Sequence, residues 1–191
     1  MAHGCSLKMF NNAQHTALTE LAHKSITHGV RHGGPIKVEL DRYDPALRVQ
    51  GACFVTLHKQ DQLRGCIGSL QTKRALVEDV AQNAYAAAFQ DPRFSPMQEN
   101  ELEDLSVHIS VLSQPESLNF STEDELLKKI RPGVDGLILI NGGHRGTFLP
   151  SVWDALPQPK AFLRQLKLKA GLAEDYWSDS IKIERYTTES W

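Results

Sequence analysis

A chain of 191 residues with 41% hydrophobic and 23% charged side chains has the composition of a folded globular protein, which excludes a disordered chain. Its formal net charge of −2 gives no electrostatic reason to expect binding to nucleic acid or to an anionic membrane. The longest apolar runs are too short to cross a bilayer, and the first residues (MAHGCSLKMF) lack the pattern of a secretion signal.

The first predicted element is an amphipathic helix over residues 12–31, which Gly33-Gly34-Pro35 ends. A hairpin follows, with strands over residues 51–58 and 63–70 on either side of the polar segment Lys59-Gln60-Asp61-Gln62. The first strand carries Phe54, Val55, Thr56 and Leu57, which suit extended structure.

The register of this hairpin decides which side chains face Cys66. Either Val55 or Thr56 can lie opposite Cys66, and we expect Thr56, which also places His58 opposite Arg64. This choice gives one buried and one polar face. They consist respectively of Cys53, Val55, Leu57, Leu63 and Ile67, and of Phe54, Thr56, His58, Arg64 and Cys66.

The rest of the chain mixes helices with alternating, strand-like segments. We expect helices over residues 73–90, from 121 to about 130 and over 159–169, and strands over 105–112, 137–140, 145–149 and 180–187. Hairpins separated by helices predict an α+β fold with a mainly antiparallel sheet and several helices, not a βαβ winding.

The three cysteines, Cys5, Cys53 and Cys66, are an odd number and include no CxxC pair. They indicate neither a disulfide framework nor a zinc site, so we expect a reducing cytoplasm. The length fits one domain over residues 1–191, or two small lobes that share a core. No sequence feature indicates a cofactor.

Residues 63–68 (LRGCIG) concentrate the chemistry of the chain. On a strand, Arg64 and Cys66 point to the same face, and a guanidinium beside a thiol favours the nucleophilic thiolate. His58 across the hairpin, or His108 on the polar side of its own strand, would accept the proton. Gly65 and Gly68 would allow a backbone or a substrate to approach closely, and nearby N–H groups could bind an oxyanion. With these two glycines as substrate-binding residues, the candidate set around the thiol is complete.

A less specific interpretation of the same residues stays open. Free cysteine is among the most buried residue types, so Cys66 would then be a small core residue. In that case Arg64 would pair with a structural carboxylate such as Asp91.

A second polar pair, Arg145 and Thr147, lies on a later strand and is a candidate for binding a carboxylate or phosphate. The alternative is that both side chains lie on a surface face of the strand, with Arg145 solvated and without a ligand. His28 and His32 have the spacing of a metal-binding pair, but no third ligand is apparent, and we predict no metal site.

Several further motifs lie in a fixed order along the chain: GACFVTL, LRGCIGSL, DPRFSP, ISVLSQP, GVDGLIL, TFLPSVW and FLRQLKLKAGL. Together they resemble the AMMECR domain family, whose prokaryotic members are called AmmeMemoRadiSam system protein A. The family signature corresponds to Arg64, Gly65, Cys66, Ile67 and Gly68. One position departs from the family pattern, because Ser151 stands where a glutamine is familiar.

The resemblance implies an α+β protein of two unequal lobes sharing a cleft, with the signature near that cleft. It implies no assigned biochemical activity. It also implies a Memo-type protein and a radical-SAM enzyme as partners, because the genes of the family are associated with theirs.

Two functional hypotheses follow. The first is an enzyme in which Cys66 acts on a small anionic metabolite or a modified residue. The second is a non-catalytic module that binds a protein or a small ligand through Arg64 and Arg145. We expect neither a nucleic-acid nor a membrane partner.

Overall fold

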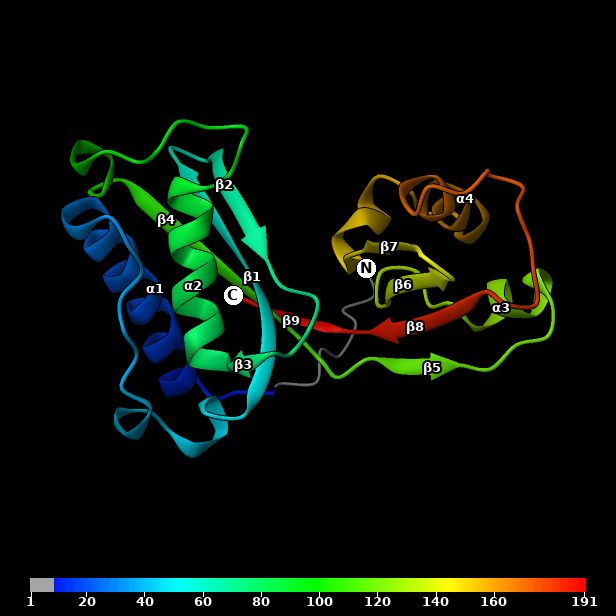
Figure 1. The fold of residues 1–191 in the computed structure, drawn as a ribbon, viewed down its shortest axis with the longest axis horizontal. Helices are drawn as coiled ribbons and strands as arrows, with labels where there is room; N and C mark the ends of the chain where they lie inside the picture. Colours follow the sequence, from blue (N-terminus) through cyan, green and yellow to red (C-terminus); the bar gives the residue numbers. More distant parts are fainter. Residues whose placement is uncertain (1–8) are drawn as a thin grey trace. The chain divides into compact units, whose positions relative to one another are not determined.

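The structure, a computed structural model, describes residues 9–191, so Cys5 lies outside the described residues. The chain divides into two compact units. We call residues 9–112 and 189–191 the signature unit and residues 113–188 the second unit. The described chain contains α-helices and two antiparallel sheets, which confirms the α+β prediction (Figure 1). That residues 1–191 form one domain stays a prediction.

The signature unit is a sheet covered on one face by two helices. Its strands are β1 (Gln50–Lys59), β2 (Gln62–Gly68), β4 (Leu105–Leu112) and β9 (Thr188–Ser190), in the order β2-β1-β4-β9, and a short β3 (Arg74–Ala75) pairs with β1. The helices are α1 (Asn12–His32) and α2 (Leu76–Phe89), which lie side by side on the sheet (Figure 1). Alternation along β1 directs Cys53, Val55 and Leu57 toward the helices, and all three are fully buried.

Local sequence signals explain where α1 begins and ends. Asn11 and Gln14 form a reciprocal capping box at its start. Gly33 ends the helix in the left-handed conformation, with φ of 74°, which a residue without Cβ adopts at little cost. The predicted helix over residues 12–31 is therefore confirmed.

The β1–β2 hairpin combines a two-residue turn with a bulge. Gln60 and Asp61 have φ of 50° and 60°, and Lys59 pairs with Gln62. The register then shifts, because Leu57 pairs with Gly65 whereas the next residue, His58, pairs with Leu63. Arg64 is therefore the extra residue of a β-bulge.

This bulge decides the outcome of the register prediction. Thr56 does pair with Cys66, as expected. The pairing of His58 with Arg64 is wrong, because the bulge places Leu63 opposite His58. The predicted burial of Leu63 is also wrong, since it is 41% exposed.

The second unit has its own sheet and core. Its strands are β5 (Glu116–Leu118), β6 (Gly136–Asn141), β7 (His144–Phe148) and β8 (Lys182–Tyr186), in the order β5-β8-β6-β7, and its helices are α3 (Glu123–Lys129) and α4 (Pro159–Lys169). Trp153 stacks on Phe162 with ring centroids 3.8 Å apart. Around this pair lie buried side chains of β6, β8 and both helices, including Leu126, Leu137, Leu139, Leu166 and Ile183.

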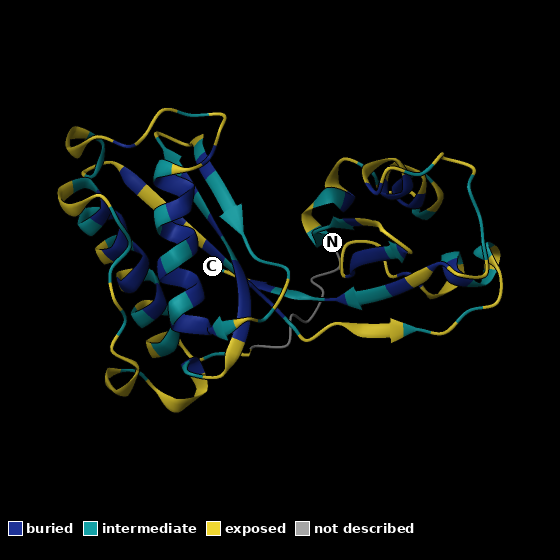
Figure 2. Ribbon diagram, viewed as in Figure 1, coloured by how far each residue is buried: buried dark blue, intermediate teal, exposed yellow. Residues whose placement is uncertain are grey.

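Burial follows these two cores, with the middle of β1 and much of α2 buried and the loops exposed (Figure 2). The short strands β3, β5 and β9 were not predicted; they have too few residues for an alternating pattern to be recognised. Within residues 9–191, none of the helices has the length and apolar content needed to span a bilayer.

Candidate functional site

The candidate site lies on the sheet face of the signature unit opposite α1 and α2, which we call the polar face. Thr56 in the middle strand pairs with Cys66 of β2 on one side and with His108 of β4 on the other. The Thr56 hydroxyl donates a hydrogen bond to Cys66 Sγ at 3.3 Å. The Cys66 and His108 backbones are two strand spacings apart, roughly 10 Å, so His108 flanks Thr56 and not the thiol itself.

The two predicted proton acceptors lie against each other on this face. The rings of His58 and His108 meet edge to face, with centroids 5.2 Å apart. His108 Nε2 lies 3.4 Å from the Ser106 hydroxyl. His58 Nδ1 is buried and has no hydrogen-bond partner within residues 9–191. A buried, unpaired ring nitrogen is costly to maintain and is therefore a position where a ligand or water would be favoured.

The Arg64 guanidinium binds residues of the segment that follows α2. Its Nε and Nη2 donate to the two carboxylate oxygens of Glu101 at 2.7 and 3.1 Å, and Nη2 also donates to the Ser95 carbonyl at 2.9 Å. These bonds lower the pKa of Glu101 to about 2. Arg64 therefore pairs with a carboxylate, as the less specific interpretation expected, but the partner is Glu101 and not Asp91.

Asp91 instead joins Cys66 to a second arginine. Its Oδ2 accepts the Cys66 backbone N–H at 2.9 Å and Arg93 Nη2 at 2.7 Å. The hydrogen bonds from Arg93 hold the pKa of Asp91 well below its usual range, so the carboxylate stays charged. The sequence analysis did not assign Asp91 or Arg93 to the site. The DPRF motif was the available signal, and only the fold shows that it reaches the edge of β2.

Other residues of the protein fill the space beside the two signature glycines, Gly65 and Gly68. A Cβ at Gly65 would overlap the carbonyl oxygen of Ala87, and a Cβ at Gly68 would overlap the ring of Phe54. Glycine is required at both positions for close packing. The α2 backbone at Gly65 is one of the two kinds of group expected to approach these glycines, and that they bind a substrate stays a prediction.

Arg145 and Thr147 belong to the second unit. The Thr147 hydroxyl donates to the Leu137 carbonyl at 2.9 Å and lies 3.1 Å from the Tyr186 hydroxyl. Burial raises the pKa of Tyr186 to about 12. Thr147 thus has a packing role inside its sheet, whereas Arg145 is exposed on β7.

Cys53 differs from Cys66 in its surroundings. It is fully buried, and burial raises the pKa of its thiol well above the ordinary value. Beside it, the buried Asp79 accepts hydrogen bonds from the Cys53 backbone, Ser69 and Asn83. This network stabilises the contact between β1 and α2, and leaves Cys66 as the more accessible of the two described thiols.

At least one of His28 and His32, whose spacing is that of a metal-binding pair, has a structural role. The rings of His28 and His32 are 4.5 Å apart, and His28 Nδ1 lies 2.8 Å from the Gly34 carbonyl. Within residues 9–191, no three histidine, cysteine or acidic side chains gather in a way that would hold a metal ion.

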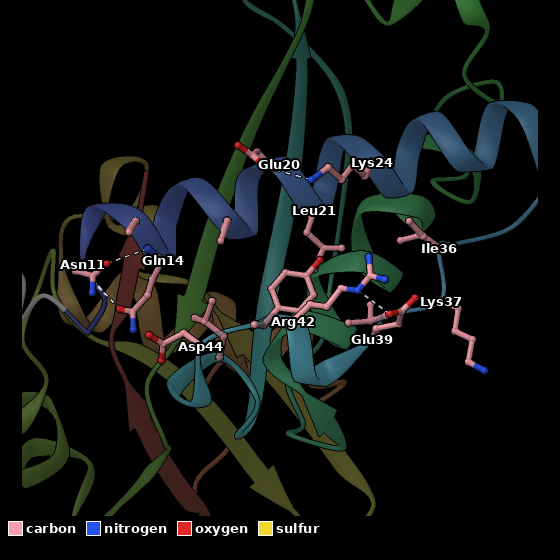
Figure 3. A pocket seen from close by; sticks show the side chains of 15 residues that line it. Asn11, Gln14, Glu20, Leu21, Lys24, Ile36, Lys37, Glu39, Arg42 and Asp44 are labelled. Carbon is pink, nitrogen blue, oxygen red and sulfur yellow. Dashed lines mark hydrogen bonds and ion pairs between the residues drawn. The ribbon is translucent and has the colours of Figure 1, made fainter.

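A groove of about 560 Å³ runs between α1 and residues 36–47 (Figure 3). Glu20 pairs with Lys24 at 3.2 Å and Glu39 with Arg42 at 2.7 Å, so these lining charges are paired within the protein. None of the site residues expected from the sequence lines this groove.

Comparison with known proteins identifies relatives over most of the chain. The AMMECR1 family model matches residues 19–191. Protein SSO0193 of Saccharolobus solfataricus is 39% identical over 181 residues, covering 88% of this chain and 77% of that protein. A protein of Thermotoga maritima is 40% identical over 162 residues, covering 84% and 88%.

A solved structure agrees with this relationship. The crystal structure of the uncharacterized protein PH0010 from Pyrococcus horikoshii has a TM-score of 0.85 and 32% identity, covering 95% of this chain and 92% of that one. Its resemblance extends over both units described above. Since the family model and the relatives cover most of the sequence, the chain belongs to the AMMECR1 family.

Proposed function

We propose that this protein is a thiol-dependent enzyme in which Cys66 is the nucleophile, acting on a small anionic metabolite or a modified residue. The observation that carries the proposal is the hydrogen bond from the Thr56 hydroxyl to Cys66 Sγ, 3.3 Å long. A donor directed at sulfur stabilises the thiolate relative to the thiol. Cys66 is half-buried, whereas Cys53 is fully buried.

The histidines support the same proposal. Imidazole is the side chain best suited to proton exchange near neutral pH, and the rings of His58 and His108 lie against each other on the polar face. No ring nitrogen in the described part of the chain hydrogen-bonds to Cys66 Sγ, so proton transfer would run through a water molecule or through the bound substrate. The unpaired Nδ1 of His58 is the group available for that contact.

The alkylation rate of Cys66 by iodoacetamide at neutral pH tests this proposal. Trypsin cleaves after Arg64 and Lys73, so peptide 65–73 reports Cys66 separately from the other cysteines. We expect the folded protein to react faster at Cys66 than the urea-unfolded chain, and Thr56→Val to remove most of that advantage. Thr27→Val, which changes a half-buried threonine of α1, is the matched control. Reaction at Cys66 only after unfolding would exclude Cys66 as a nucleophile of the folded protein.

A second candidate is a non-catalytic module that binds partners. It is favoured by the Arg64–Glu101 pair, which leaves the thiol without the cation expected beside it. In this proposal a Memo-type protein and a radical-SAM enzyme are the partners, and the exposed Arg145 is an anchor. Titration calorimetry with the purified partners would give weaker binding for Arg145→Ala than for the wild type. Equal affinities would count against Arg145.

We also propose that the protein works in a reducing cytoplasm. The support is that Cys53 and Cys66 are both free thiols. Fractionation of the native cells, followed by thiol labelling of the recovered protein, would show an oxidised Cys66 if this proposal were wrong.

A further inference from the structure

Arg93 is held in place beside Cys66 by a buried carboxylate. The Asp91 side chain is 2% exposed. Its Oδ1 accepts the Arg93 backbone N–H at 3.1 Å and Arg93 Nε at 3.0 Å, while its Oδ2 accepts Arg93 Nη2 and the Cys66 N–H. The guanidinium and the Cys66 backbone share one oxygen atom, so they lie within roughly 6 Å of each other.

The two arginines near the signature differ in what they can still bind. The Arg64 side chain is 12% exposed; its Nε and Nη2 bind Glu101 and Ser95, and its Nη1 is buried without a hydrogen-bond partner within residues 9–191. The Arg93 side chain is 55% exposed. A guanidinium has five N–H donors, and Asp91 receives only two from Arg93, so three have no hydrogen-bond partner within residues 9–191. The Phe94 ring lies 5.4 Å from the Arg93 guanidinium carbon and limits where the fork can turn.

The charges of the two groups also interact. The hydrogen bonds that Arg93 donates to Asp91 are the main cause that raises the pKa of Arg93, and the charge of Cys66 acts in the same direction. Arg93 is therefore cationic at any working pH and close enough to affect an anion at the sulfur.

We propose that Arg93 is the anion-binding side chain of the Cys66 site, oriented by Asp91 to hold a carboxylate or phosphate oxygen of the substrate beside Sγ. This inference rests on the thiol function proposed above and adds the class of substrate group that the site takes. It gives Arg93 the role that the sequence analysis expected of Arg64. Asp91 is a positioning residue, because it acts through Arg93 and the Cys66 backbone.

Two alkylating reagents of similar size test the inference. Iodoacetate carries a carboxylate and iodoacetamide is neutral. With each, Sγ forms a bond to the methylene carbon, iodide leaves with the bonding electron pair, and the thiol proton passes to the buffer. The ratio of the two rates at Cys66, read from peptide 65–73, reports the attraction of an anion independently of the reactivity of the thiol.

We expect Arg93→Gln to lower the iodoacetate-to-iodoacetamide ratio about threefold or more at low ionic strength, because a unit positive charge within roughly 6 Å of the Cys66 backbone is lost and Asp91 is left uncompensated. Arg93→Lys should keep most of the ratio. Arg42→Gln, which removes an exposed arginine of the same unit, should leave it unchanged. An unchanged ratio in Arg93→Gln, or an equal fall in Arg42→Gln, would overturn the inference.

A second measurement does not need a reactive thiol. The Arg93 Nε–H signal, assigned by its loss in Arg93→Gln, is followed by NMR as inorganic phosphate is added at constant ionic strength. A saturable shift with an inert Cys66 would support the anion site and reject the thiol function. No saturable shift together with an unchanged alkylation ratio would reject Arg93 whatever the reactivity of Cys66.

Discussion

Two acidic side chains, Asp91 and Glu101, determine what the arginines around Cys66 can do. Each carboxylate binds Nε and Nη2 of its arginine, but the Arg64 side chain is 12% exposed and the Arg93 side chain is 55% exposed. The sequence could not predict this division. Glu101 lies 37 residues after Arg64, and only the path of the loop after α2 brings the two together.

The Arg64–Glu101 pair predicts an acid-dependent loss of stability. Hydrogen bonds from Arg64 lower the pKa of Glu101 from 4.5 to about 2, so the native state favours the charged carboxylate. This stabilisation is complete above pH 4.5 and is lost as the pH falls toward 2. We expect Glu101→Gln to have a lower Tm than the wild type at pH 7 and a smaller difference at pH 3. A constant Tm difference across this range would contradict the assignment.

Gly65 predicts a steric effect of a single methyl group. A Cβ at this position would meet the carbonyl of Ala87, which is backbone and cannot rotate away. We expect Gly65→Ala to destabilise the protein by about 1–3 kcal/mol in urea unfolding. Gly34→Ala is the control, since a Cβ there has no neighbour within 4 Å. Equal stability of the two variants would show that α2 moves aside.

At the scale of elements, the predicted pairing of Thr56 with Cys66 in the β1–β2 hairpin is correct, although the turn and bulge that produce it were not predicted. A two-residue turn alone would place another residue opposite Cys66, and the bulge at Arg64 restores the pairing with Thr56. Hydrophobic alternation predicted the pairing in the middle of the strands. It could not predict the bulge, because an extra residue leaves no mark in the pattern.

The turn itself can be tested. Gln60 and Asp61 both adopt positive φ, a conformation that Asn-Gly favours in two-residue hairpins. We expect the double substitution Gln60→Asn and Asp61→Gly to stabilise the protein by about 0.5–1 kcal/mol, measured as an increase in Tm. Gly142→Ala, at φ of 58°, should lower the Tm. A lower Tm for the double variant would contradict the turn geometry.

At the scale of the whole molecule, the described chain has two separate hydrophobic cores. One gathers around α1, α2 and β1, and the other around the Trp153–Phe162 stack. The sequence predicted most helices and long strands, because each has its own periodicity. The family resemblance implied two unequal lobes, but the periodicity could not give the boundary between them, since the contacts that separate two cores are not periodic along the chain.

The two cores predict local effects of core substitutions. Phe162→Ala leaves a cavity against Trp153 and should speed amide hydrogen exchange in β6, β8 and α4 before β1 and β4. Val80→Ala in α2 should have the reverse distribution. Uniform acceleration throughout the chain in both variants would instead support one cooperative domain over residues 1–191.

The last strand, β9, has a consequence for folding during synthesis. It joins the sheet of the signature unit, where Trp191 and Ile109 exchange both backbone hydrogen bonds, although the second unit lies between them in sequence. A ribosome therefore releases α1, β1, β2, α2 and β4 well before the strand that completes their sheet. Until then the outer edge of β4 is an unpaired template, open to chaperones or to a neighbouring nascent chain.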